Sequence, residues 1–119
     1  MARVLVAEDE AAVAQFILRA LGGAGHQVTL TGDGGAALRA ATSAPFDLVL
    51  SDIRMPVMDG IALALALATD RPGLPVVLMT GYAAEYERAE DFDGLVAGLL
   101  LKPFSLSDLL AAVEAALAR

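Results

Sequence analysis

Short apolar runs alternate with segments of helical character along the chain. A short, almost continuously apolar run is typical of a strand that is covered on both faces in a parallel sheet. The third such run is the clearest, because it ends abruptly at Asp52 and then at a loop that contains a proline. The predicted strands are Arg3–Ala7, Gln27–Thr31, Phe46–Ser51, Leu74–Thr80 and Leu99–Leu101.

Segments that favour helix lie between these strands and after the last of them. Across Ala11–Leu21 the apolar residues recur at helical spacing, and a pair of glycines follows as a stop signal. Near the other end of the chain, Ser105 or Ser107 is expected to cap a last helix that runs to Arg119. Two further helices are predicted over Ala36–Ala41 and Ala83–Ala89.

The segment Ile61–Leu67 gives two conflicting signals. Its isoleucine and leucines alternate strictly with other residues, which by periodicity alone favours a strand. The intervening residues are all alanine, a strong helix former, and no polar face appears at any period. We therefore predict a helix here.

Five strands that alternate with helices predict a doubly wound, five-stranded parallel α/β sheet. Right-handed crossovers would place helices on both faces of this sheet. The length of 119 residues suits one domain with a real core and leaves no room for a second module. In such sheets the functional crevice lies at the carboxyl ends of the strands, where the strand order reverses.

Composition and charge exclude several classes of protein. Hydrophobic residues make up 57% of the chain, yet no apolar run approaches the length of a membrane span. The net charge of −7, with only eight scattered Lys and Arg residues, argues against direct binding of nucleic acid. The absence of cysteine excludes disulfides and thiolate metal sites. The first residues lack the pattern of a signal peptide, so we expect a cytoplasmic protein.

Polar or charged side chains stand at the carboxyl ends of four predicted strands. A carboxylate such as Asp52 at the end of a buried strand is costly unless water, a metal or a reaction uses it. Taken singly, each of these residues has a simpler explanation, such as capping a turn or complementing a helix dipole. Their joint occurrence favours a functional site. The residues are Glu8, Asp9, Asp52, Thr80 and Lys102.

From Arg3 to its end, the chain resembles a receiver domain of bacterial two-component response regulators. Each matching motif is weak alone, but their order and spacing are highly specific. The motifs are Glu8-Asp9, Asp52-Ile53-Arg54-Met55-Pro56 followed by Met58-Asp59-Gly60, Met79-Thr80-Gly81, and Lys102-Pro103-Phe104. The resemblance implies a flavodoxin-like fold, in agreement with the predicted sheet.

The resemblance also implies a phosphoacceptor and a metal site. Asp52 would attack a phosphoryl group and become an aspartyl phosphate, provided that a cation neutralises the repulsion between the two anions. Mg²⁺ prefers oxygen ligands and usually keeps several waters. By resemblance, Asp9 and Asp52 would bind it directly, the backbone carbonyl of Arg54 would add a ligand, and Glu8 would act through water.

Two further residues are implied to contact the phosphoryl oxygens. Lys102 would neutralise one oxygen, and the Thr80 hydroxyl would donate a hydrogen bond to another. The bond between Lys102 and Pro103 is expected to be cis, which helps to aim the lysine. His26, the only histidine, is expected at the surface and far from the crevice. In this family the phosphodonor histidine belongs to a partner protein.

The chain departs from the family pattern at Leu99. Receivers usually carry Tyr or Phe three residues before the conserved lysine, and the rotamer of that ring, linked to the Thr hydroxyl, reports phosphorylation. Leucine has no ring edge or hydroxyl, so either Tyr82 takes over part of this role or the signal travels through the helix after Thr80. We expect that helix to be short and mobile, because acidic residues crowd it. These are Glu85, Glu87, Glu90, Asp91 and Asp93.

The leading interpretation is a single-domain response regulator spanning 1–119, with no output domain: a signalling switch rather than an enzyme. Its expected partners are a sensor histidine kinase or histidine phosphotransfer protein and a downstream protein, and we expect a monomer or weak homodimer. Leu99 keeps open the alternative of a receiver that works as an interaction or dimerisation module without phosphorylation. A receiver excised from a hybrid kinase would give the same pattern. A phosphatase is disfavoured, because such enzymes need a second aspartate where Arg54 stands.

Overall fold

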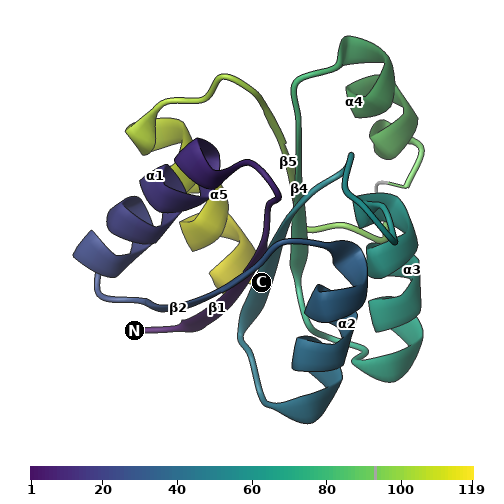
Figure 1. Cartoon of the computed structure of the whole chain (residues 1–119), viewed down its shortest axis with the longest axis horizontal. Coiled ribbons are helices and arrows are strands. Elements are labelled where there is room, and N and C mark those ends of the chain that lie inside the picture. Colours follow the sequence, from purple (N-terminus) through teal and green to yellow (C-terminus); the bar gives the residue numbers. More distant parts are fainter. Residues whose placement is uncertain (93) are drawn as a thin grey trace.

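Five parallel strands form a single sheet in the computed structural model, which describes residues 1–92 and 94–119. The strand order is β2-β1-β3-β4-β5, so the predicted doubly wound parallel α/β fold is confirmed (Figure 1). The strands are β1 (Arg3–Ala7), β2 (Gln27–Thr31), β3 (Leu48–Asp52), β4 (Val76–Thr80) and β5 (Gly98–Leu101). The helices are α1 (Ala11–Gly23), α2 (Gly34–Ser43), α3 (Gly60–Asp70), α4 (Ala83–Glu90) and α5 (Leu106–Leu117).

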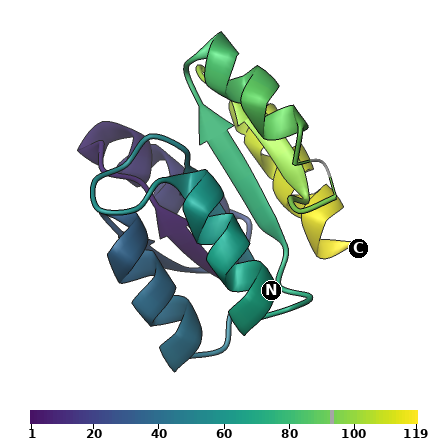
Figure 2. The ribbon, with the colours of Figure 1, turned by 90° about the vertical axis from the view of Figure 1, so that its right-hand side faces the viewer.

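Helices cover both faces of the sheet, as Figures 1 and 2 show. Side chains alternate across a strand, and in β1 this sends Val4 and Val6 into one apolar cluster with α1 and α5. Leu5 and Ala7 enter the opposite cluster, which includes residues of α2, α3 and α4. Because both faces are covered, every residue of β3 and β4 is buried, which explains the continuous apolar sequence of these strands.

The ambiguous segment Ile61–Leu67 is helical and lies within α3. The side chain of Asp59 caps this helix by accepting a hydrogen bond from the backbone N–H of Ala62, at 2.8 Å. Leu63 and Leu67 are buried, one helical turn apart, whereas Leu65 is 49% exposed. Helix propensity and the aspartate cap therefore decide the structure of this segment, and its alternating leucines do not.

Several boundaries differ from the prediction by a few residues. β3 and β4 each begin two residues later than expected, and β3 extends to include Asp52 itself. Of the two candidate caps for α5, Ser105 is the one used, in a capping box with Asp108, and the helix ends at Leu117 rather than Arg119. The acidic helix α4 is short, as predicted. Asp93, one of the acidic residues assigned to it, lies outside the described residues.

The prediction that His26 is a surface residue is wrong. Only 7% of its side chain is exposed, and its Nδ1 accepts a hydrogen bond of 3.0 Å from the backbone N–H of Ala2. The histidine therefore helps to tie the residue before β1 to the residue before β2.

None of the helices in residues 1–92 and 94–119 combines the length and the apolar character that a bilayer crossing requires.

Close packing at Gly60 fixes the start of α3 against the end of β3. The backbone N–H of Gly60 donates a hydrogen bond of 2.8 Å to the carbonyl oxygen of Ile53. A Cβ atom at Gly60 would overlap the backbone carbonyl of Asp52. The glycine is thus required for the close approach of helix and strand at the point where Asp52 is held.

We predict that Gly60→Ala lowers the free energy of unfolding by about 1–3 kcal/mol, because the added methyl group has no room. Gly22→Ala in α1 is the matched control, since a Cβ there would have no neighbour within 4 Å. This control should be neutral or slightly stabilising, because alanine is the better helix former. Urea unfolding followed by circular dichroism measures both effects, and equal destabilisation by the two variants would contradict the packing argument.

Candidate functional site

Three carboxylates meet at the carboxyl ends of β1 and β3. Glu8 and Asp9 directly follow β1, Asp52 is the last residue of β3, and these two strands are neighbours in the sheet. One oxygen from each carboxylate lies within 4.8 Å of the others. Glu8 and Asp52 are buried, whereas Asp9 is exposed. The parallel sheet therefore brings together the acidic residues that the sequence analysis grouped.

Lys102 follows β5 and reaches across to this cluster. Its Nζ lies 2.6 Å from Glu8 Oε1 and 3.2 Å from Asp52 Oδ2. The peptide bond between Lys102 and Pro103 is cis, as predicted, and the backbone N–H of Lys102 donates to the carbonyl oxygen of Thr80 at 2.7 Å. One ammonium group is thus shared by two buried carboxylates.

Burial and crowding of like charge change the acidity of the site. Burial and, to a smaller extent, the nearby Glu8 carboxylate raise the pKa of Asp52 from its ordinary value of 3.8 to about 6, although Lys102 opposes both effects. Burial acts to lower the pKa of Lys102, but its contacts with Glu8 and Asp52 outweigh burial and raise that pKa above the ordinary value. Lys102 is therefore protonated and positively charged, whereas the ionised form of Asp52 is disfavoured relative to a carboxyl group in water.

The donor set fits a hard divalent cation. Carboxylate oxygens are the ligands that Mg²⁺ prefers, and it needs only one or two of them beside its waters. Asp9, Asp52 and Glu8 offer such oxygens, and one ammonium group leaves this cluster with excess negative charge. A hollow of about 650 Å³ opens beside Asp9, Asp52 and Lys102. Arg54, two residues after the end of β3, also lines it, and its backbone carbonyl is the expected additional ligand.

The Thr80 hydroxyl lies at the end of β4 and is engaged by a residue that the sequence analysis did not assign to the site. Its Oγ1 donates a hydrogen bond of 2.8 Å to Glu85 Oε1 and accepts one of 3.1 Å from the backbone N–H of Tyr82. Glu85 Oε2 accepts a hydrogen bond of 2.9 Å from Nε of Arg54. The Arg54 guanidinium in turn lies 3.7 Å from the centre of the Tyr82 ring. The sequence placed Glu85 only among the several acidic residues of α4, so its contact with Thr80 was not predicted.

Leu99 lies in the middle of the sheet edge formed by β5. It pairs in register with Leu78 of β4 and packs, partly buried, against the apolar cluster beneath α3 and α4. Its side chain therefore belongs to the core on this face. Tyr82, by contrast, is half exposed at the start of α4 and contacts the loop that follows Asp52.

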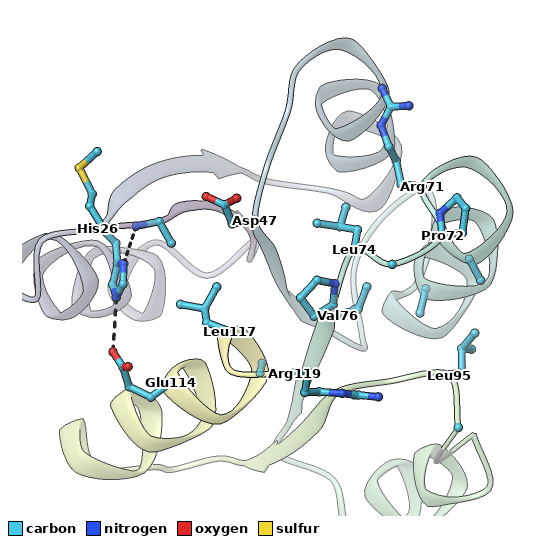
Figure 3. A pocket seen from close by; sticks show the side chains of 18 of the residues that line it. His26, Asp47, Arg71, Pro72, Leu74, Val76, Leu95, Glu114, Leu117 and Arg119 are labelled. Atoms are coloured by element: carbon cyan, nitrogen blue, oxygen red, sulfur yellow. Dashed lines mark hydrogen bonds and ion pairs between the residues drawn. The ribbon is translucent and has the colours of Figure 1, made fainter.

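A larger hollow lies at the opposite end of the sheet, where β1 and β4 begin. Figure 3 shows it, with His26 directed toward Glu114 of α5, the two groups being 3.8 Å apart. Arg71, on the same rim, gives hydrogen bonds to the backbone carbonyls of Ala41 and Thr42. The acidic cluster and Lys102 lie at the other end of the strands, so the smaller hollow beside Asp52 is the better candidate for chemistry.

Comparison with known proteins agrees with this geometry. The sequence matches the family model of the response regulator receiver domain over residues 4–114. The chain belongs to the response regulator receiver family. Receivers are components of two-component signalling, so the predicted family and the predicted class of signalling switch are both confirmed at this level.

Relatives of this receiver include proteins of similar length and longer ones. It is 39% identical to the response regulator receiver protein CpdR of Brucella abortus, over 96% of this chain and 95% of that protein. It is 34% identical to the transcriptional regulatory protein TcrA of Mycobacterium tuberculosis, of which it covers 45%. The receiver thus spans nearly all of one curated relative and about half of another.

Solved receiver structures superpose closely on this one. The chemotaxis response regulator CheY4 of Vibrio cholerae gives a TM-score of 0.87 at 31% identity, over 96% of this chain and 97% of that one. The receiver domain of the sensor histidine kinase PA1611 of Pseudomonas aeruginosa gives 0.89 at 27% identity, over 99% and 98% of the two chains. The latter structure has a magnesium ion coordinated in its active-site cleft.

The raised pKa of Asp52 predicts a stability gain from Asp52→Asn in metal-free buffer. A folded-state pKa of about 6, above the ordinary 3.8, means that the carboxyl group favours folding while protonated and that this contribution is lost as the pH rises through 6. At pH 8 with EDTA, Asp52→Asn should therefore raise the free energy of unfolding by about 1–3 kcal/mol.

Urea unfolding at several pH values measures this effect. The gain should shrink toward zero as the pH falls below about 4, where Asp52 is protonated in both states. Asp70→Asn, at an exposed position in α3, is the control for removing one negative charge. A gain in stability that does not depend on pH, or one matched by the control, would contradict the raised pKa of Asp52.

Proposed function

We propose that this receiver is a phosphorylation switch with Asp52 as the phosphoacceptor. An Asp52 oxygen forms a bond to phosphorus while the bond from phosphorus to an imidazole nitrogen of the partner's phosphohistidine breaks. The electron pair of the broken bond stays on that nitrogen. The single observation that carries the proposal is the joining of Glu8, Asp9, Asp52 and Lys102 at one end of the sheet, beside an open hollow.

Mg²⁺ is the cation that we assign to the carboxylate cluster. When bound, it offsets the negative charge of Asp52 and of the incoming phosphoryl group. Asp9 and Asp52 would hold it directly, with the backbone carbonyl of Arg54, and Glu8 would act through water. The magnesium ion in the cleft of the PA1611 receiver supports this assignment, as does the oxygen donor set of the cluster.

Lys102 and Thr80 are the groups that we assign to the phosphoryl oxygens. The ammonium of Lys102 already lies 3.2 Å from Asp52, so it is placed to neutralise an oxygen on a group attached there. The Thr80 hydroxyl would donate to another oxygen once its present acceptor is displaced. Phosphorylation then switches a face of the protein that a downstream protein binds, through Tyr82 and α4 rather than through Leu99.

The proposed partners are a sensor histidine kinase or a histidine phosphotransfer protein, and one downstream protein. Cytoplasmic location, a monomer or weak homodimer, and action as a single domain stay part of the proposal. The match to the CpdR receiver protein over 95% of that protein supports single-domain action. The PA1611 neighbour, a receiver within a sensor histidine kinase, supports the alternative of a hybrid kinase.

An interaction module that works without phosphorylation is the second candidate. Two observations favour it: Leu99 replaces the usual aromatic residue, and the Thr80 hydroxyl is bonded to Glu85. The intact group of Glu8, Asp9, Asp52 and Lys102 favours the switch.

The proposal predicts that one phosphoryl group is added to the chain by acetyl phosphate in the presence of Mg²⁺. Intact-mass measurement should detect this addition within the lifetime of the aspartyl phosphate. The modification should be absent with EDTA and absent in Asp52→Ala. If the native chain binds Mg²⁺ but gains no mass from acetyl phosphate or from phosphorylated histidine phosphotransfer proteins, the interaction module is the better description.

A further inference from the structure

The Thr80 hydroxyl has no proton left to donate. A hydroxyl group carries one O–H donor, and that of Thr80 points to Glu85 Oε1 at 2.8 Å. Its oxygen also accepts the backbone N–H of Tyr82 at 3.1 Å. A phosphoryl oxygen on Asp52 therefore obtains this hydrogen bond only if Glu85 gives it up.

Glu85 is held firmly in this position. Its other oxygen accepts from Nε of Arg54 at 2.9 Å, and only 16% of its side chain is exposed. Burial acts to raise the pKa of Glu85, but the hydrogen bonds from Thr80 and Arg54 outweigh it and lower that pKa below its ordinary value. Glu85 is thus a carboxylate at neutral pH, which can accept hydrogen bonds but not donate them.

The same contacts join the loop after Asp52 to the first turn of α4. Arg54 stands two residues after Asp52, and its guanidinium lies 3.7 Å from the centre of the Tyr82 ring while it bonds Glu85. A cation above a ring and a charge-assisted hydrogen bond each favour this arrangement. The loop that carries the acceptor and the helix that could report on it are therefore connected through one arginine.

A phosphoryl group on Asp52 would conflict with this arrangement. It brings close to two negative charges and three acceptor oxygens to a site where Glu85 already holds the only hydroxyl proton of Thr80. Two anions competing for one donor in a partly buried site repel each other. One of them has to move, and the phosphoryl group is fixed covalently.

We propose that Glu85 competes with the phosphoryl group on Asp52 for the Thr80 hydroxyl, so that phosphorylation displaces Glu85 and releases the first turn of α4. This inference rests on the proposed function. It assigns to Glu85, Arg54 and Tyr82 the readout that Leu99 cannot provide, and it makes Glu85 a positioning residue that slows acceptance of the phosphoryl group.

Glu85→Gln tests the competition, because it keeps the size of the side chain and removes its charge. Loss of the charged acceptor should speed phosphorylation by acetyl phosphate with Mg²⁺ by about three- to tenfold, measured by intact mass over time. Glu87→Gln is the matched control: it removes one charge from the exposed side of the same helix and should leave the rate unchanged. Equal rates for Glu85→Gln and the native chain would overturn the inference.

A double-mutant cycle separates competition from simple removal of negative charge. In the Thr80→Ala background there is no hydroxyl to compete for, so Glu85→Gln should lose its accelerating effect. An acceleration that persists in full without the hydroxyl would overturn the competition, because it would show that Glu85 acts only as a nearby charge.

Tyrosine fluorescence reports the displacement itself. The chain has no tryptophan and two tyrosines, Tyr82 and Tyr86, so Tyr86→Phe leaves Tyr82 as the single reporter. Acetyl phosphate and Mg²⁺ should change its fluorescence as Arg54 leaves the ring, and Asp52→Ala should abolish the change. Mass-verified phosphorylation with unchanged Tyr82 fluorescence overturns the inference alone. If the native chain accepts no phosphoryl group, the proposed function and this inference fail together.

Discussion

The structure depends on balancing charge that is buried at the end of a parallel sheet. Glu8 and Asp52 lie out of water, and a single ammonium, that of Lys102, contacts both. Burying an unpaired charge costs several kcal/mol, so the lysine is required by the carboxylates. It reaches them because the carboxyl ends of β1, β3 and β5 meet at one edge, and the apolar core below holds that edge in place.

How much of this could be read from the sequence follows from the physics of each element. Buried parallel strands are recognisable in the sequence as short apolar runs, and their carboxyl ends lie at one edge of the sheet. The sequence therefore predicted that Glu8, Asp52 and Lys102 lie together, as they do in the structure. The α3 segment was harder, because alternating leucines suit either structure. The aspartate cap and the alanines stabilise a helix here, and as a consequence Leu65 points to solvent. The starts of β3 and β4 were predicted two residues too early, because Phe46 and Leu74, just before these strands, are as apolar as the residues inside them.

What could not be predicted are contacts that depend on side-chain direction across the fold. Arg54 and Glu85 are far apart in sequence, and nothing local indicates that both reach toward Thr80. His26 is similar: a lone histidine just before the second strand was predicted at the surface, but its ring is buried and accepts a hydrogen bond from the backbone N–H of Ala2. In both cases the chemistry was visible in the sequence and the geometry was not.

Arg54 bears both on phosphatase chemistry, which the sequence disfavours, and on the proposed switch. An enzyme that turns over phosphoesters through an aspartyl phosphate needs a second acid two residues after the nucleophile, to protonate the leaving group and activate water. An arginine cannot serve as that acid and base, because it stays protonated. At the same position its guanidinium bonds Glu85 and covers Tyr82, which holds α4 against the site. A cation placed here therefore disfavours rapid turnover and at the same time couples the acceptor loop to a helix. The proposed switch needs this combination, in which the modification would persist and a neighbouring helix would respond to it.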